Sequence, residues 1–212
     1  MENKTILEYL LSDKEILEHL RGAKIEELRE EAFAEHIRDC AESLRKKKTP
    51  AQIQSAAKAL AAIPMENQNV ARIWDTGEYL YVMSPRTVVR VRGNGIALEG
   101  SSLPVLKAAE KLFDTEQHAG ETVSDIDWPF FLAEATTDFK KKKPWIGLYR
   151  EGAEPYGYAV DAASLVPALT ILCKPERVWT WGTERARTMR LENDSIAVVT
   201  LLKKEEKEEG DK

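Results

Sequence analysis

The sequence predicts an α+β fold in which amphipathic helices precede a mostly antiparallel sheet. Three observations lead to this prediction. Residues 3–64 carry apolar side chains at helical spacing. Residues 70–92 predict three short strands, because β-prone side chains stand between turn signals at Asp75–Gly77 and Ser84–Pro85. Residues 162–202 repeat the same order, a helix followed by three strands.

The first helical stretch covers residues 3–20, where leucines and isoleucines recur at helical spacing. It is either one amphipathic helix or two short helices broken near Ser12–Asp13, and Gly22 ends it. A longer helix is expected over 24–47, with an apolar stripe from Ile25 to Leu44. Glutamates in its first turns and basic residues at its end match the helix dipole.

A third helix is expected over residues 50–63. Thr49 can cap its N-terminus, Pro50 suits the first helical position, and Pro64 ends it. Each amphipathic stripe must be buried against the chain's own sheet, another helix or a partner. The stripe of the 24–47 helix can therefore support a helical hairpin or a homodimer.

The middle of the chain is less regular. A glycine turn at 93–95 precedes a short expected strand at 96–98, and residues 103–113 predict a helix. Within 114–144, the apolar stretch 128–133 suits either a short helix or a docked loop.

The last third returns to a clear alternation of strands and one helix. Asp161 is a plausible N-cap for the helix, and Asn193–Asp194 marks the final hairpin turn. The expected elements are strands 145–150 and 156–160, helix 162–172, and strands 177–181, 185–191 and 196–202.

Two halves therefore share one plan, a helix followed by an antiparallel meander, in pattern and not in residue identity. We expect a helical N-terminal segment at 1–48, a sheet domain at 49–204 and a charged, disordered tail at 205–212.

The segment Tyr158-Ala-Val-Asp-Ala-Ala-Ser-Leu-Val-Pro-Ala-Leu-Thr-Ile-Leu172, with the strands after it up to Leu202, resembles one half of a DNA sliding-clamp domain. Residues 75–90 resemble the other half, so the likeness spans about 50–204. It implies a clamp-like fold of one domain, whereas clamps build rings of six. Ring-lining helices need basic side chains, but helix 162–172 has none and helix 50–63 has only Lys58. The resemblance therefore implies a binding module that does not encircle DNA.

The composition indicates a cytoplasmic protein. The net charge of −5 provides no global basic field for nucleic acid or anionic membrane, and 43% of the residues are hydrophobic. No run approaches the roughly 18 apolar residues that span a bilayer, so no membrane contact is expected. Cys40 and Cys173 are interpreted as buried thiols of a reducing compartment.

Sequence motifs for catalysis are absent, so we expect no enzyme activity, no cofactor and no metal. No serine stands in a Gly-x-Ser-x-Gly elbow, and no phosphate loop is present. His36 and Cys40 have metal-ligand spacing, but a zinc site needs further ligands that the sequence does not show. An enzyme with a dispersed site remains a second hypothesis, with Asp125, Asp127 and Arg90 as its candidate residues.

Basic residues with nearby aromatics are the candidate binding residues. Three groups stand out, in the first meander, in the lysine run after residue 139 and around the turn at 182. In strand geometry, Arg86, Arg90 and Arg92 share one face. The residues expected to contact a partner are Arg86, Arg90, Arg92, Lys140, Lys141, Lys142, Lys143, Trp145, Trp179, Trp181, Arg185 and Arg187.

These residues predict a non-enzymatic binding protein that engages a protein or nucleoprotein complex, such as a viral or mobile-element accessory or inhibitor protein. Trp and Arg dominate the energetics of protein interfaces. The lysine run followed by Trp145 can also bind phosphates while a ring stacks, so direct nucleic-acid contact stays open. Alternatively, the sheet face that carries Trp179 and Trp181 is covered by the N-terminal helices of the same chain and does not contact a partner. A third hypothesis is a transcription regulator that binds DNA through the helices within 24–64. The acidic faces of these helices disfavour it.

Overall fold

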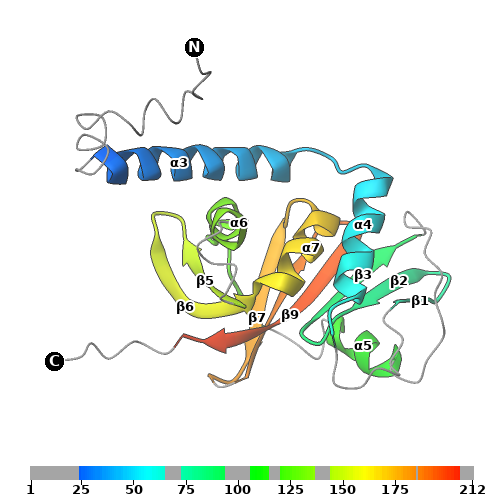
Figure 1. The fold of residues 1–212 in the computed structure, drawn as a ribbon. Helices are drawn as coiled ribbons and strands as arrows, with labels where there is room; N and C mark the ends of the chain where they lie inside the picture. Colours follow the sequence, from blue (N-terminus) through cyan, green and yellow to red (C-terminus); the bar gives the residue numbers. More distant parts are fainter. Residues whose placement is uncertain are drawn as a thin grey trace, which may run out of the picture.

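The structure is a computed structural model that describes residues 24–64, 73–93, 106–114, 120–136, 144–184 and 186–205. Within these ranges it contains five helices and a nine-stranded antiparallel sheet (Figure 1), so the α+β prediction is confirmed. In the part of the chain that the structure describes, no helix combines the length and apolarity needed to cross a membrane.

The helices are α3 (Lys24–Arg45), α4 (Pro50–Ala61), α5 (Leu106–Leu112), α6 (Trp128–Thr136) and α7 (Ala162–Leu172). The strands are β1 (Ile73–Asp75), β2 (Tyr79–Met83), β3 (Thr87–Arg92), β4 (Glu121–Thr122), β5 (Trp145–Arg150), β6 (Glu154–Asp161), β7 (Arg177–Gly182), β8 (Arg187–Glu192) and β9 (Ile196–Lys204).

The expected repetition of a helix and three strands is present, as α4-β1-β2-β3 and α7-β7-β8-β9. The main path through the sheet runs β1-β2-β3-β9-β8-β7-β4. The last strands of the two halves are thus antiparallel neighbours, with Val89 opposite Val198. Helices α4 and α7 pack on each other. The strand order of the second half is therefore the reverse of that of the first.

Strand β9 connects the two halves with the β5–β6 hairpin. One of its edges pairs with β8 along most of its length. The other edge pairs first with β3 and then, near its end, with β6 through Tyr158 and Lys204. Consequently, the strand before α7 is held next to the start of β3.

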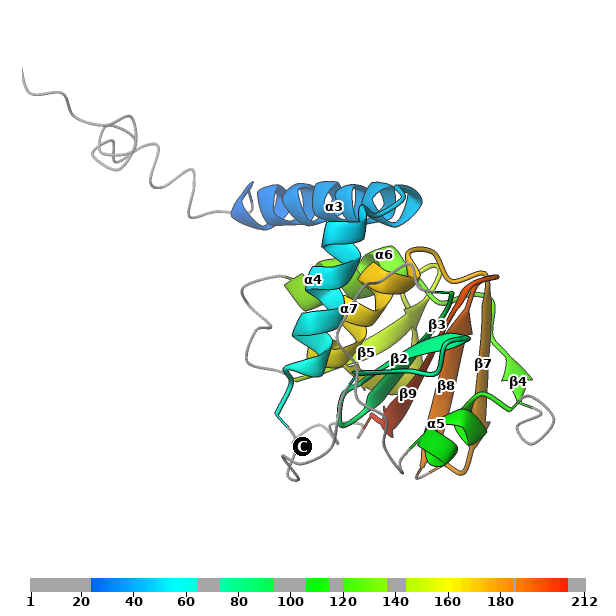
Figure 2. The ribbon, with the colours of Figure 1, turned by 90° about the vertical axis from the view of Figure 1, so that its right-hand side faces the viewer.

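The two faces of the sheet bury different cores, because successive side chains point to opposite sides. Leu80, Val89 and Val198 face α4, α6 and α7 in the larger core. The alternate residues, such as Val88 and Val199, face α5 and Phe113 in a smaller core. We call the second side the α5 face. In Figure 2 it lies opposite α4 and α7.

Helix α3 lies on α6 and buries part of its apolar stripe there. The Phe33 ring meets Phe130 edge to face at 5.7 Å between centroids, and the His36 ring nitrogen Nε2 lies 2.6 Å from the Thr136 hydroxyl. Leu44 is buried in the larger core. This half of the stripe is therefore occupied within the chain, and α3 packs on α6, away from the α5 face. The alternative that the N-terminal helices cover this face is thus wrong for α3.

The two cysteines are free thiols near the same end of α3. Burial raises the pKa of Cys40. Cys173 caps the C-terminus of α7 with a positive φ of 68°, and its thiol donates to the carbonyls of Leu44 and Lys46. The end of α7 is thereby tied to the end of α3.

Several elements differ from their expected form. The stretch expected as a short helix or a docked loop is helix α6 and extends to Thr136. Strand β4 was not expected, because two residues are too few to show alternation. Asp161 precedes α7 as expected, but its carboxylate accepts from Arg86 and Ser164 side chains and does not cap the backbone. The expected helix at 3–20 and strand at 96–98 lie outside the described residues.

Replacing Thr49 by alanine is expected to lower the free energy of unfolding by about 1 kcal/mol. Thr49 and Gln52 form a capping box, in which the Thr49 hydroxyl accepts from the Gln52 amide at 3.3 Å and the Gln52 side chain accepts from the Thr49 amide at 2.9 Å. Urea unfolding measures the loss. Thr49→Ser keeps the hydroxyl and should stay close to the original chain; an equal loss in both variants would contradict the capping role.

Candidate functional site

Basic and aromatic side chains from three strands come together on the α5 face. Arg90 lies on β3, Arg190 on β8 and Trp179 on β7. Their register places them on one side, since Arg90 pairs with Ala197, next to β8, and Arg190 pairs directly with Trp179. The sheet thus gathers residues that are far apart in the sequence.

Arg90 is positioned by aromatic partners. Its Cζ lies 4.6 Å from the centroid of the Tyr79 ring and 4.5 Å from that of Phe113. Its charge also acts on the neighbouring Tyr81 hydroxyl. Burial raises the pKa of Tyr81, and the Arg90 charge partly opposes this rise. The two rings orient its guanidinium, and no carboxylate of the described residues pairs with it.

Arg190 is buried beneath the same surface, where hydrogen bonds fix its guanidinium. It is only 6% exposed, and its Nε and Nη2 donate to a Glu192 carboxylate oxygen at 2.8 and 2.5 Å. Its Nη1 donates to the Phe113 carbonyl at 3.0 Å. Glu192 also accepts from Arg177 at 3.1 Å, so one buried carboxylate fixes two guanidinium groups.

A small hollow of about 160 Å³ lies between these side chains. Of the described residues that line it, the charged ones are four arginines and two carboxylates, so its formal charge is +2. They are Arg90, Arg92, Arg177, Arg190, Glu192 and Asp194. The chain as a whole carries −5. The hollow is therefore a positive site on an acidic protein.

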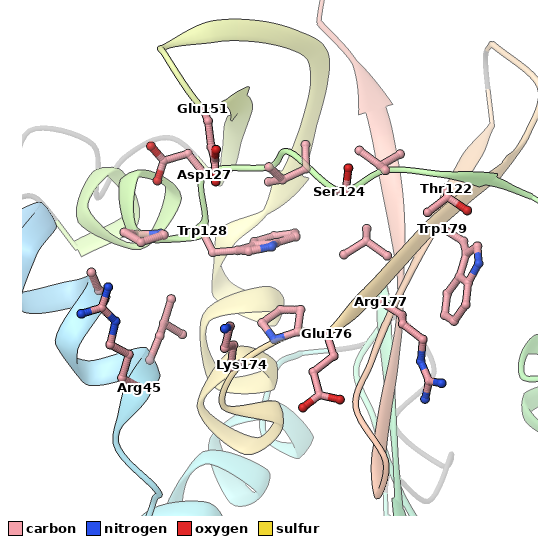
Figure 3. Close-up of a pocket in the computed structure, with 17 residues that line it drawn as sticks. Arg45, Thr122, Ser124, Asp127, Trp128, Glu151, Lys174, Glu176, Arg177 and Trp179 are labelled. Carbon is pink, nitrogen blue, oxygen red and sulfur yellow. The ribbon is translucent and has the colours of Figure 1, made fainter.

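A second concavity is a groove of about 770 Å³ between α3, the start of α6 and the start of β7 (Figure 3). Its apolar part includes Trp128, Pro175 and Val178. Its charged side chains balance, with three cations and three carboxylates among the described lining residues. They are Arg45, Lys174, Arg177, Asp127, Glu151 and Glu176. The groove has no charge preference, and it meets the hollow at Arg177.

The candidate residues of a dispersed enzyme site lie in different places. Asp125 pairs with Arg150 at 3.0 Å, and Asp127 accepts from the Phe130 amide at 2.9 Å at the start of α6. Arg90 lies at the hollow, whereas Asp127 lies at the groove. Within the described ranges, no cluster of His, Cys, Asp and Glu could hold a metal ion.

The sheet brings together only some of the predicted binding residues. Arg90 and Arg92 share the α5 face, as their parity predicts. Arg86 stands in the turn before β3, where its guanidinium pairs with buried Asp161 at 3.1 Å and lies 4.8 Å from the Trp145 ring centroid. The expectation that all three arginines share a face is thus wrong for Arg86, because strand alternation does not extend into a turn.

The third predicted group is divided in the same way. Trp179 and Trp181 project from the α5 face of β7. Arg187 extends from the opposite face, where it donates to Tyr158 and Thr180 and pairs with Glu121. The hydrogen bond to Tyr158 is the main cause that raises the pKa of Arg187. Lys140–Lys143 and Arg185 lie outside the described residues.

Arg177, which lines the hollow, and Phe113, whose ring contacts two of its arginines, carried no functional signal in the sequence. Arg177 was expected only as the start of a strand, and Phe113 only as the end of a helix. Strand pairing of Arg177 with Glu192 brings the first of them to the hollow. The parity of β7, in which Arg177, Trp179 and Trp181 alternate with Val178 and Thr180, was the one signal that could have indicated Arg177.

No family model, no curated protein and no solved structure matches this chain.

Proposed function

We propose that this chain is a non-enzymatic, cytoplasmic binding protein that engages a protein or nucleoprotein complex through its α5 face. The observation that carries the proposal is the hollow, where oriented arginines leave a charge of +2 on an acidic chain. Complementary charge steers association and selects partners. Four arginines line the hollow, and Trp179 lies beside one of them, Arg190. Arginine and tryptophan are the residues that most often dominate interface energies.

A resemblance to a sliding-clamp domain supports the accessory role. Two helix-plus-meander halves with neighbouring last strands are compatible with it. Helix α7 carries no basic side chain, and α4 carries only Lys58, so encircling DNA is disfavoured. A lone module of this kind suits a viral or mobile-element accessory or inhibitor protein that docks on a larger complex.

The preferred target of the α5 face is a protein surface. Nucleic-acid binding needs a series of cations along the phosphate backbone. Around the hollow, by contrast, Glu192 and Asp194 stand among the arginines. An acidic patch of a protein, alone or within a nucleoprotein complex, matches one confined positive site better.

Reversing one charge at the hollow is expected to abolish partner capture. Affinity purification from the native host should recover at least tenfold less partner with Arg92→Glu than with the original chain, because Arg92 is exposed at the hollow. Arg38→Glu makes the same charge change on an exposed position of α3 and should leave capture unchanged. Full capture by Arg92→Glu, or equal loss in both variants, would contradict docking through the α5 face.

A further inference from the structure

We propose that the hollow on the α5 face binds the phosphate monoester of a phosphorylated side chain on the partner protein. The inference rests on the proposed docking function and adds the chemistry that the partner must present. Three properties of the hollow support it: its charge, the preorganisation of its donors and its size.

The charge of the hollow matches that of a monoester. A phosphorylated side chain carries about −1.5 to −2 at neutral pH and offers three strong acceptor oxygens. The described lining residues carry +2. Glu192 is already shared between Arg190 and Arg177, which leaves Arg90 and Arg92 without a carboxylate partner in the described part of the chain. A dianion would therefore balance the site, whereas a single carboxylate would leave it positive.

The donors are held in place before any ligand arrives. Arg190 is anchored by Glu192 and by the Phe113 carbonyl, and Arg90 is oriented by the Tyr79 and Phe113 rings. A guanidinium has five N–H donors in its plane, so these contacts leave N–H groups available for phosphate oxygens. Because these two side chains are already ordered, binding loses little of their conformational entropy.

The hollow is large enough for a single chemical group, but it is too small to enclose a whole drug-sized ligand. Pockets that enclose drug-sized ligands measure about 300–1,000 Å³. The hollow measures about 160 Å³, which suits a phosphoryl group whose carrier extends along the α5 face. A phosphorylated side chain fits this description, since its phosphate stands at the end of a short stem.

A nucleic-acid backbone is the less suitable carrier. Its phosphates are diesters with one charge each, and their neighbours along the strand need further cations. At the hollow, however, an acidic side chain stands beside Arg177. An oxygen of the Asp194 carboxylate lies 3.9 Å from Nη2 of Arg177, and the Asp194 side chain is 92% exposed. This carboxylate would repel a second phosphate. It also competes with the first one for Arg177.

The direct test is an NMR titration of the full chain with a short glycine–alanine peptide that contains one phosphoserine. Saturable shifts are expected at the side-chain N–H signals of Arg90 and Arg190 and at the Trp179 indole N–H. The same peptide with serine should give none. Arg92→Gln and Arg90→Gln should each weaken binding at least tenfold, Asp194→Asn should strengthen it severalfold, and Arg38→Gln should leave it unchanged.

Arg92 is exposed, so Arg92→Gln keeps the test valid even if Arg90→Gln fails to fold. Absence of saturable shifts, or binding that survives Arg92→Gln unchanged, overturns the inference. Tighter binding of a 5′-phosphorylated oligonucleotide than of the phosphopeptide overturns the assignment to a protein carrier.

A phosphatase-treated host lysate separates this inference from the proposed function. If treatment abolishes capture that also depends on Arg92, both stand. If capture depends on Arg92 but survives treatment, docking stands and the phosphate inference fails. If the phosphopeptide binds but capture is the same with Arg92→Glu, the proposed function fails.

Discussion

Replacing Glu192 by alanine is expected to lower the free energy of unfolding by about 3–5 kcal/mol. Glu192 is 8% exposed and accepts from Arg190, which is 6% exposed. Removing the carboxylate leaves the Arg190 guanidinium buried, with the Phe113 carbonyl as its remaining acceptor among the described residues. Urea unfolding followed by circular dichroism measures the change, and the midpoint should fall without a change in slope.

The matched control for this prediction is the double variant Arg190→Met and Glu192→Leu. It removes both charges and fills the space with apolar side chains of similar length, a change that is often neutral or stabilising for buried ion pairs. The double variant should therefore recover most of the stability that Glu192→Ala loses. A loss below about 1 kcal/mol in the single variant would show that Arg190 reaches solvent in the folded chain, and its anchoring role at the hollow would be wrong.

Replacing Trp74 by alanine is expected to lower the free energy of unfolding by a similar amount, about 3–5 kcal/mol. Trp74 is 2% exposed and stacks on Tyr81, with centroids 5.3 Å apart and ring planes at 9°. Alanine would leave a cavity in the smaller core, next to the Tyr81 ring. Thermal or urea unfolding measures the loss.

Trp74→Phe separates the effect of packing from that of hydrogen bonding. The buried indole Nε1 of Trp74 has no hydrogen-bond partner among the described residues, so phenylalanine removes an unsatisfied donor and keeps an aromatic ring. We expect a loss of no more than about 1–2 kcal/mol. If both variants lose the same stability, an acceptor for the indole must exist, and the packing argument would be incomplete.

Most elements of the fold could be predicted because their signals are local. Thr49 and Pro50 start α4 at the expected residue, and turn residues separate β1, β2 and β3 as expected. Alternation placed Arg90 and Arg92 on one face. The two-residue strand β4 carried no periodic signal, and the side chain of Asp161 found partners other than the backbone.

The candidate site could be predicted only in part. Arg90 and Arg92 were identified because their strand shows its parity in the sequence. Arg86 was misplaced because it stands in a turn, and Arg187 because the α5 face takes the alternate residues of β8. Arg177 was overlooked because its role depends on Glu192, fifteen residues away across a hairpin.

The sequence by itself determined the class of most described elements, the cap that starts α4 and which residues share a strand face, because backbone preferences and side-chain periodicity act over a few neighbours. Only the tertiary structure decided that β3 lies beside β9, that α3 packs on α6 and that Phe113 contacts Arg90 and Arg190. These contacts depend on which apolar faces are buried together, a competition among all the elements of the chain. The positive hollow exists because that competition brought together arginines from strands nearly a hundred residues apart.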